Sequence, residues 1–407
     1  MRRSRPTAER LLAWIALGAL WAAGCDSEPS ADPGALKLGL LLSYTGHFTA
    51  DSINSERALL MAVEAANAAG GVGGRRLTTV GRDTGSDPSK VAARAQELVD
   101  EKVALVIGPD ADDLAIAARQ VLEGRTIILP SFATSSDVLF KPRPWFVIGA
   151  PVARMACELA AQLRADHREK PLIIFNPNGY SASIAWVLTN QYGFPRFVLP
   201  ANTVPSIADV LPITSARADA YVLAATPSSA VPLVYALLAN GALVDPTRWY
   251  LSPTLHSPVF LNLIPKGGMA GARGVAQGTA IDGPDFRTRF FKRWNDDALD
   301  DAYPFYDAGA VAALSLQRAL TQTGAIPSGT GMSEHLVAVT RPGGIPVRWN
   351  ELDKGLALLR QNQAITYLGV SGQLAFDALG QTPGATTSWW TIGPDGFVPG
   401  EGSKGCQ

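Results

Sequence analysis

The sequence predicts an α/β fold made of two doubly wound parallel-sheet lobes. Short continuous apolar runs alternate with longer segments of helical periodicity along most of the chain. Apolar runs without alternation are typical of strands that are covered on both faces. Strands that alternate with helices over short loops favour a parallel sheet. The pattern restarts after about residue 150, so two α/β units of similar size are expected.

The first cycle begins with the apolar run "LKLGLLL" at residues 36–42, which reads as a buried strand. Residues 52–69 then show apolar positions at helical spacing, and the pair Gly70-Gly71 ends that helix. Asp87 followed by Pro88 is the pattern of an N-cap and a first helical residue. The other elements expected in this cycle are strands at 76–83, 103–108 and 126–130 and a helix at 112–123.

The second cycle has the same rhythm. The elements expected are strands at 171–176, 196–200, 219–225 and 248–252 and helices at 181–192 and 228–241. The C-terminal segment "SWWTIGPDGFVPG", residues 388–400, predicts a β-hairpin that turns at Pro394-Asp395-Gly396.

The N-terminal segment differs from the rest of the chain. A basic head is followed by the uncharged stretch Leu11–Gly24, which is short of the roughly 20 apolar residues that span a bilayer. This order is typical of an export signal. The sequence "AAGC" resembles the lipobox of bacterial lipoproteins, which implies removal of residues 1–24, lipidation of Cys25 and a flexible tether over 25–35. An ordinary signal peptide or an uncleaved anchor are the alternatives.

Composition and motifs give little support to catalysis. The net charge is −1 and no Lys/Arg block follows the N-terminus, so a nucleic-acid partner is not expected. The four histidines are scattered without metal-binding spacing, and no nucleophile elbow or phosphate loop occurs, so no metal, cofactor or enzyme activity is expected. The glycines of "GVGG" at 71–74 follow a helix and precede a strand, which indicates a turn.

Two further cysteines, Cys157 and Cys406, leave two possibilities open. An exported protein can form disulfides, and these two residues could pair. Two separate thiols are the alternative.

Several segments resemble one known family in their order and spacing. The segments are "LKLGLLLSYTG", "DTGSDPSKVAARAQELV", "ILPSFATSSD" and "GVSGQLAFDALGQ". They are similar to the branched-chain amino acid (Leu/Ile/Val-type) periplasmic solute-binding proteins of ABC transporters. The resemblance implies a type I periplasmic binding fold whose lobes are joined by a three-crossover hinge. The implied boundaries are 36–148 plus 279–366 for the first lobe, 149–278 plus 367–398 for the second, and 399–407 for a C-terminal tail.

The resemblance also implies a function. Such a protein captures a small molecule, amino-acid-like or a related compound, between its lobes and passes it to ABC permease subunits in the membrane. A monomer, anchored by its lipid at the periplasmic or extracytoplasmic face, is implied as well. A ligand-sensing receptor or regulatory domain of the same fold, and a degenerate protein without a ligand, are the alternatives.

The resemblance also implies a ligand-binding site, at the positions of this sequence that match the family's ligand-binding residues. The ligand-binding residues expected are Asp112, Phe132, Ala133, Thr134, Tyr180, Thr226, Thr254 and Tyr303. Asp112 stands where the family has a carboxylate-binding serine, and Thr254 where it has an ammonium-binding glutamate. Binding of leucine, isoleucine or valine is therefore expected to be weak or absent, and Asp112 is expected to face a positive or hydroxyl group of the ligand.

Each of these residues also has a plainer interpretation. Asp112, or its neighbours Asp110 and Asp113, could cap the following helix. Phe132 and Tyr303 could pack in the core. The ligand's identity is left open by the sequence.

Overall fold

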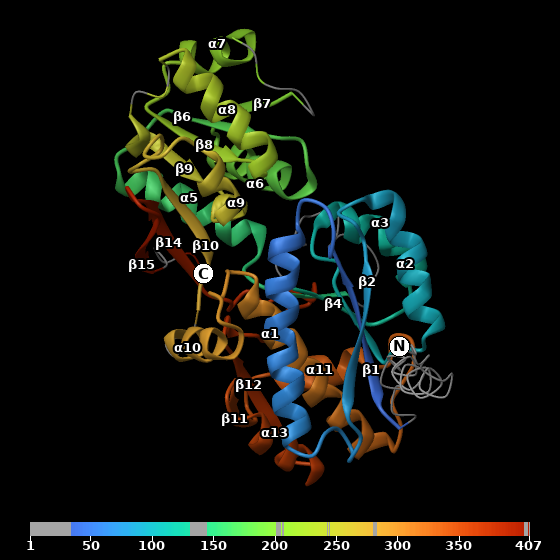
Figure 1. Ribbon diagram of the computed structural model, residues 1–407. Coiled ribbons are helices and arrows are strands. Elements are labelled where there is room, and N and C mark those ends of the chain that lie inside the picture. The colour runs from blue at the N-terminus through green and yellow to red at the C-terminus, as the bar shows by residue number, and fades with distance from the viewer. Residues whose placement is uncertain are drawn as a thin grey trace, which may run out of the picture. The chain divides into compact units, whose positions relative to one another are not determined.

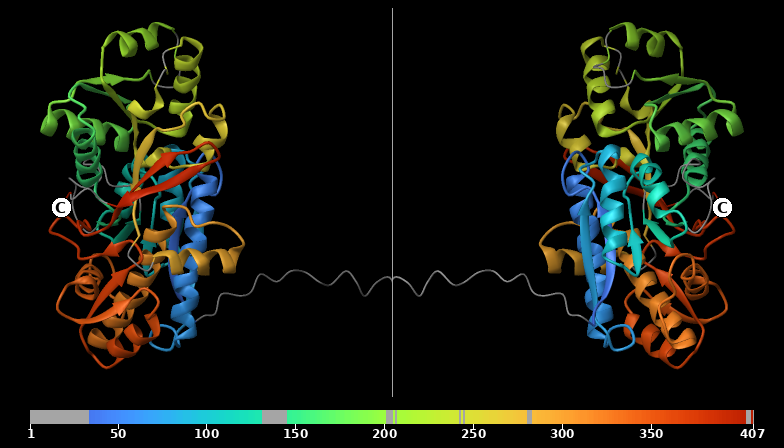
Figure 2. Two further views of the ribbon diagram at one scale, coloured as in Figure 1. Left: turned by 90° about the vertical axis from the view of Figure 1, so that its left-hand side faces the viewer. Right: turned by 90° about the vertical axis from the view of Figure 1, so that its right-hand side faces the viewer.

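Two β-sheets, each covered by helices on both faces, organise the computed structural model (Figures 1 and 2). The structure describes residues 34–130, 145–200, 205, 207–241, 243, 245–279, 283–402 and 406. Cys25 and the predicted loop residues Phe132, Ala133 and Thr134 lie outside these ranges. The strands of the five-stranded sheet lie within the predicted first-lobe range, and those of the seven-stranded sheet lie within the predicted second-lobe range except for residues 399–402, which were expected in the C-terminal tail.

The five-stranded sheet has the order β2-β1-β3-β4-β5, and all its neighbouring strands are parallel. Its strands are β1 (Leu36–Leu42), β2 (Leu77–Asp83), β3 (Leu105–Ile107), β4 (Ile127–Pro130) and β5 (Trp145–Ile148). Leu38 and Leu40 pack in the core that holds α1 (Thr49–Ala68) and α11 (Ala302–Thr323). Leu41, from the opposite face, packs with α2 (Pro88–Asp100) and α3 (Asp112–Leu122). The expected double winding is therefore confirmed for this sheet.

The seven-stranded sheet has the order β15-β14-β10-β9-β8-β6-β7. Its strands are β6 (Pro171–Phe175), β7 (Arg196–Val198), β8 (Ala220–Ala224), β9 (Trp249–Leu251), β10 (Arg273–Gln277), β14 (Thr387–Ile392) and β15 (Phe397–Gly402). The core on one face holds α5 (Val152–Ala165) and α6 (Gly179–Tyr192). The other face is covered by α7 (Ile207–Ser215), α8 (Pro227–Ala239) and α9 (Pro258–Leu263).

The last strands of this sheet depart from the parallel pattern. Strands β14 and β15 form an antiparallel hairpin, drawn in red in Figure 2, and β14 pairs antiparallel with β10. Ile392 pairs with Phe397 across the turn, so the predicted C-terminal hairpin is confirmed. Among the described strands the fold is thus mixed, with parallel pairs at the centre of both sheets.

A small third sheet, β11-β12-β13, packs beside α11. The remaining elements are η2 (Pro246–Arg248), η3 (Pro253–Leu255), α10 (Gly283–Trp294), α12 (Ser333–Thr340), β11 (Ile345–Arg348), α13 (Leu352–Arg360), β12 (Ile365–Gly369) and β13 (Gly372–Gln373). Tyr367 and Leu374 belong to the same core cluster as α11. The chain then joins the seven-stranded sheet at β14.

The helix boundaries follow local sequence signals closely. Asp87 caps α2 by accepting a hydrogen bond from the Ser89 backbone N–H at 3.0 Å, and Pro88 begins the helix, as predicted. Gly70 and Gly71 have positive φ angles of 90° and 70° directly after α1. The start of that helix was predicted at residue 52 but lies at Thr49, because polar residues fill its first turn and show no apolar spacing.

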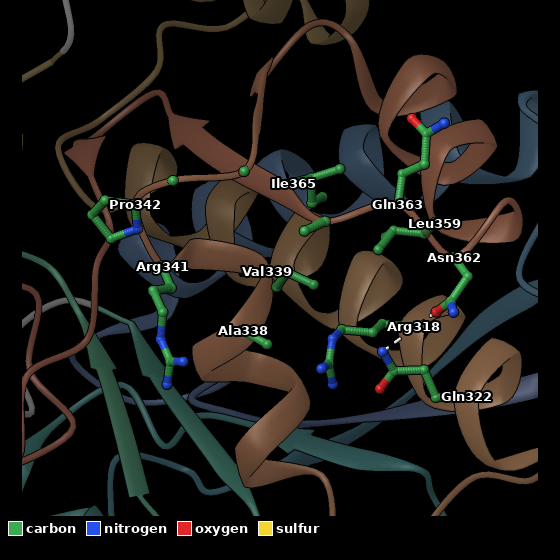
Figure 3. Close-up of a pocket in the computed structure, with 13 residues that line it drawn as sticks. Arg318, Gln322, Ala338, Val339, Arg341, Pro342, Leu359, Asn362, Gln363 and Ile365 are labelled. Carbon is green, nitrogen blue, oxygen red and sulfur yellow. Dashed lines mark hydrogen bonds between the residues drawn. The ribbon is translucent and has the colours of Figure 1, made fainter.

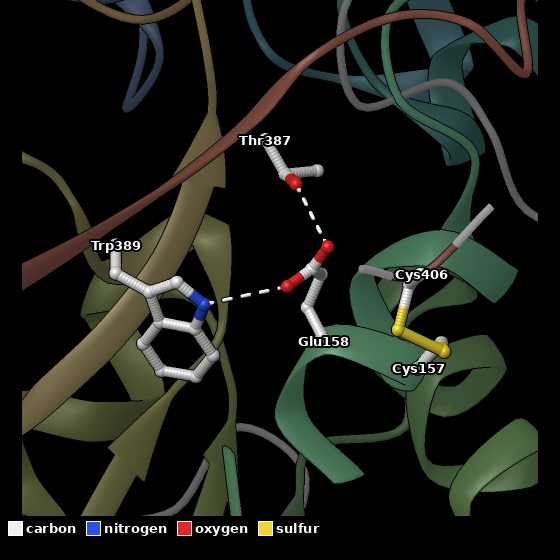
Figure 4. Close-up of a disulfide and its surroundings, with 5 residues drawn as sticks. All are labelled: Cys157, Glu158, Thr387, Trp389 and Cys406. Atoms are coloured by element: carbon white, nitrogen blue, oxygen red, sulfur yellow. Dashed lines mark hydrogen bonds between the residues drawn. A yellow bond between two sulfur atoms is a disulfide. The ribbon is translucent and has the colours of Figure 1, made fainter. Parts of the chain in front are cut away.

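Cys157 and Cys406 form a disulfide with a Cα–Cα distance of 5.9 Å, which settles the open choice between a pair and two thiols (Figure 4). The neighbouring Glu158 is fully buried in α5. Its carboxylate accepts hydrogen bonds from Thr387 Oγ1 at 3.1 Å and Trp389 Nε1 at 3.5 Å. Cys406 and β14 are therefore both bonded to α5.

Among the described residues, no helix has the length and apolar content that crossing a membrane requires. The His, Cys, Asp and Glu side chains of these residues form no group of three or more that could hold a metal ion.

Candidate functional site

The loops at the carboxyl ends of β3 and β6 bring residues of the two lobes together. In parallel sheets, ligands bind beyond the carboxyl ends of the strands. After β3 the chain runs through Asp110 to Asp112 and into α3, and after β6 it runs through Asn178 to Gly179 and into α6. The first turns of α3 and α6 contact each other.

Asp112 is the first residue of α3 and is only 4% exposed. Its Cβ and Oδ2 atoms lie 3.1 and 3.2 Å from the point that a Cβ atom on Gly179 would occupy. The first turn of a helix carries unpaired N–H groups and a partial positive charge, which a carboxylate stabilises. Asp112 therefore places a negative charge where the two lobes approach each other.

The alternative in which an aspartate caps α3 is wrong. The N-cap residue is Ala111, and no side chain makes a capping hydrogen bond there. Asp113 instead accepts a hydrogen bond from the backbone N–H of its neighbour Leu114 at 3.0 Å. Asp112 and Asp113 still stabilise the helix, because acidic side chains in a first turn interact favourably with the partial positive charge at the N-terminal end of the helix.

Asp110 is buried and holds the first loop of the site in place. Its carboxylate accepts hydrogen bonds from the Ser43 backbone N–H and Oγ, each at 3.1 Å, and from Ser52 Oγ. Burial raises the pKa of Asp110, and the hydrogen bonds from Ser52 and Ser43 oppose that rise. The loop after β1 and the start of α1 are thereby fixed against the loop after β3.

Tyr180 lies in the first turn of α6 and is 5% exposed. Burial, followed by the negative charges of Asp112 and Asp301, raises the pKa of its phenol well above the usual value. The structure thus brings together the predicted residues Tyr180 and Asp112, one from each lobe.

Thr226 and Thr254 connect loops within the second lobe. The backbone N–H of Thr226 donates to Asn176 Oδ1 at 3.0 Å. Thr254 Oγ1 donates to the carbonyl of Ala225 at 2.7 Å and pairs with Ser252 Oγ at 2.8 Å. These bonds connect the three loops that follow β6, β8 and β9.

Tyr303 lies inside the first-lobe core. It is 0% exposed, its hydroxyl accepts a hydrogen bond from Arg287 Nε at 2.6 Å, and its ring packs 5.6 Å from that of Phe286. Burial raises its pKa to about 12. This geometry matches the packing alternative for Tyr303.

Three acidic residues near the site were missed by the sequence analysis. Asp51 lies in the first turn of α1, and burial together with the charges of Asp110 and Asp300 raises its pKa to about 6. Asp300 and Asp301 directly precede α11. The high density of aspartates in the run "NDDALDDAY" was the signal that could have pointed to Asp300 and Asp301. We call Asp51, Asp110, Asp112, Asp300 and Asp301 the acidic set.

His256 of the second lobe contacts this set. Its Nδ1 lies 2.5 Å from Asp300 Oδ2, and its ring stacks on Trp390 with a centroid distance of 4.9 Å. This contact joins the loop after β9 to the segment before α11, so it links the two lobes. Nothing in the local sequence around His256 indicates a partner 44 residues away.

Comparison with known proteins gives one family and consistent structural likeness. A family model described as "Periplasmic binding protein" matches residues 35–346. The chain is 28% identical over 241 residues to "Leu/Ile/Val-binding protein homolog 7" of Brucella melitensis, a match that covers 52% of this chain and 56% of that protein. It is 31% identical over 165 residues to the "Chemotactic signal transduction system substrate-binding protein BasB" of Halobacterium salinarum, with 38% and 40% covered. The chain thus spans about half the length of the curated relatives it matches, or less.

Two solved structures illustrate the shared fold. The branched-chain amino acid transporter substrate-binding protein LivJ from Streptococcus pneumoniae, in complex with isoleucine, matches with a TM-score of 0.71 and 18% identity, covering 90% of this chain and 99% of that one. A solute-binding protein from R. palustris in complex with benzoate matches with a TM-score of 0.69 and 16% identity, covering 91% and 96%. At these identities the likeness shows the fold alone.

Proposed function

Because the chain belongs to the periplasmic binding protein family, we propose that the surface at Asp112 and Tyr180 captures a small molecule for the permease of an ABC importer. The contact between the first turns of α3 and α6 is the observation that supports this location. A ligand held by both lobes stabilises the closed arrangement through contacts that the open one lacks. Capture needs no covalent chemistry, and the protein acts as a monomer.

The ligand carries a positively charged group. The acidic set contributes the carboxylates on the first-lobe side, whereas the second lobe contributes neutral groups such as Asn176, Thr254 and the Tyr180 phenol. Two like charges about 4 Å apart repel by about 4 kcal/mol at an effective dielectric constant of about 20. An α-carboxylate beside Asp112 would meet this repulsion, while an ammonium or guanidinium group would be attracted.

Free branched-chain amino acids fit this site poorly. Their α-carboxylate would face Asp112, and Thr254 offers an ammonium group no charge of opposite sign. A buried charge without a partner is strongly disfavoured. We therefore expect the ligand to be an amine, a guanidine compound or a quaternary ammonium compound.

Native mass spectrometry of the freshly purified protein tests this assignment. We expect a co-purified small molecule that leaves on denaturation and carries a basic or quaternary nitrogen. Recovery of leucine or an acidic compound instead would contradict the proposed positive charge of the ligand. The proposal that the protein captures a small molecule would still hold.

The location of the protein is extracytoplasmic, as its family indicates. The Cys157–Cys406 disulfide supports this, because disulfides persist in oxidising compartments. We propose further that Cys25 carries lipid and anchors the domain to the membrane through residues 25–35. Mass spectrometry of the mature N-terminus would show a diacylated or triacylated Cys25, and an unmodified N-terminus at another residue would exclude it.

A sensory role is the second candidate, and the similarity to the chemotactic substrate-binding protein of Halobacterium salinarum favours it. Uptake of the co-purified compound by cells that lack this chain separates the two roles. Lost uptake supports import. Normal uptake with a lost behavioural response supports sensing.

A further inference from the structure

A groove with two arginines lies on the first lobe, outside the site described above. Its volume is about 350 Å³, and it is enclosed by α11, the end of α12, the end of α13 and β12 (Figure 3). Val339, Leu359 and Ile365 are buried residues that form its apolar floor. Arg318 and Arg341 border it, and none of its lining residues is acidic.

The guanidinium of Arg318 is held by a hydrogen bond to a histidine. Its Nη1 donates to Nδ1 of the buried His335 at 2.5 Å. His335 Nε2 faces Glu334 Oε1 at 3.4 Å, so the ring is a neutral acceptor at Nδ1 and a donor at Nε2. Burial and the charge of Arg318 lower the pKa of His335, which keeps the ring neutral. The hydrogen bond therefore orients Arg318 without removing its charge.

Arg341 adds a second positive charge to the same groove. Among the described residues, neither Arg318 nor Arg341 has a carboxylate within salt-bridge distance. Burial lowers the pKa of Arg318, the negative charge of Glu334 opposes that shift, and the positive charge of Arg341 adds to it. Two like charges held around one concave surface are stabilised when an anion lies between them.

We propose that this groove binds a phosphate group. A guanidinium presents planar, paired N–H donors that match phosphate oxygens. Gln322, Asn362 and Gln363 at the rim supply neutral amide groups for further hydrogen bonds. The apolar floor suits a phosphate ester that carries a small organic part.

Free phosphate and a phospholipid headgroup share this chemistry. Two helices that border the groove, α11 and α13, contact the turn at residues 71–73, close to the start of β1. Gly73 N–H donates to Gln317 Oε1 on α11 at 2.8 Å, and Arg360 Nη2 at the end of α13 donates to the Gly71 carbonyl at 2.8 Å. Leu36 begins β1 beside this turn, with its N–H bonded to Arg76 O at 2.7 Å. The start of β1 at Leu36 is thus linked through the turn at residues 71–76 to helices that border the groove, and a lipid headgroup is one source to be tested.

Isothermal titration of the full-length, detergent-purified protein tests the proposal with three probes at low ionic strength. The probes are inorganic phosphate, glycerol 3-phosphate and glycerophosphoglycerol, the last being the diester headgroup of an anionic lipid. We expect at least one probe to bind, with a Kd raised about tenfold or more in the Arg318→Gln/Arg341→Gln variant, because hydrogen bonds to charged groups are lost. Binding of the diester points to lipid as the source, and binding of inorganic phosphate alone points to the free ion.

Arg196→Gln is the matched control for Arg341→Gln, because Arg196 is an exposed arginine on β7 of the second lobe and each substitution removes one positive charge. This control should bind like the wild type. If the double variant fails to fold, Arg341→Gln alone serves, since Arg341 is exposed. Absence of binding for all three probes overturns the proposal, and so does an equal Kd in wild type and Arg341→Gln.

Discussion

Asp112 on α3 and Gly179 on α6 approach so closely that a Cβ atom on residue 179 would lie 3.2 Å from Asp112 Oδ2. Glycine at this position lets a carboxylate from one lobe reach the first turn of a helix in the other. The same contact brings Asp112 beside Tyr180. The proposed ligand surface is thus built around a negative charge of the protein itself.

Substitution Gly179→Ala tests this close approach. Its backbone is helical, so alanine is compatible with the local conformation, and the added methyl meets Asp112 instead. Overpacking of this kind costs about 1–3 kcal/mol. Chemical denaturation should show that loss in unfolding free energy. Gly396→Ala, whose new methyl meets no atom within 4 Å, is the control and should change little. Equal stability of both variants would contradict the geometry.

Asp51 should make stability fall as the pH rises. Its pKa is raised to about 6 in the folded protein by burial and by Asp110 and Asp300. Between pH 4 and 6 the folded state therefore binds more protons than the unfolded state, and deprotonation destabilises it. Each pKa unit corresponds to about 1.4 kcal/mol.

Urea unfolding of wild type and Asp51→Asn at pH 4.5 and 7.5 measures this effect. The asparagine variant should lose less stability across that interval, by about 1–3 kcal/mol. Carboxylates that do not interact with Asp51 titrate alike in both proteins and cancel in the difference. An identical change in both proteins would show that Asp51 ionises normally.

The Cys157–Cys406 disulfide should contribute measurably to stability. It closes a loop across a sequence separation of 249 residues, and removing such a bond typically costs about 2–5 kcal/mol. Thermal unfolding of the Cys157→Ala/Cys406→Ala variant should occur at a lower temperature than in the wild type. Dithiothreitol should lower the wild-type midpoint toward that of the variant and leave the variant unchanged. A midpoint insensitive to both changes would mean that the bond does not form.

Local signals in the sequence predict much of the fold. The apolar run at 36–42 marks β1 because a strand covered on both faces needs no polar alternation. Asp87 and Pro88 mark the start of α2 because their chemistry satisfies helix ends locally. In each case a pattern within a few residues predicts the element, and no knowledge of tertiary contacts is needed.

Contacts between distant segments are what the sequence does not reveal. Asp300 and His256 meet because the loop after β9 and the segment before α11 come together, and neither segment specifies the other. Tyr303 was expected at the ligand, yet a tyrosine can serve equally in a core when Arg287 satisfies its hydroxyl. Pairing of Cys157 with Cys406 likewise depends on how the last residues return to α5.

Thermal melting of the full-length protein with a panel of small molecules tests the central claim most directly. The panel contains agmatine, putrescine and choline as cations and leucine, isoleucine and valine as amino acids. A ligand at 100 times its dissociation constant adds about 2.7 kcal/mol of stability. We predict an upward shift with a cation, reduced in Asp112→Asn but kept in the exposed neighbour variant Asp113→Asn, and no shift with leucine. A shift with leucine and none with any cation would contradict the account.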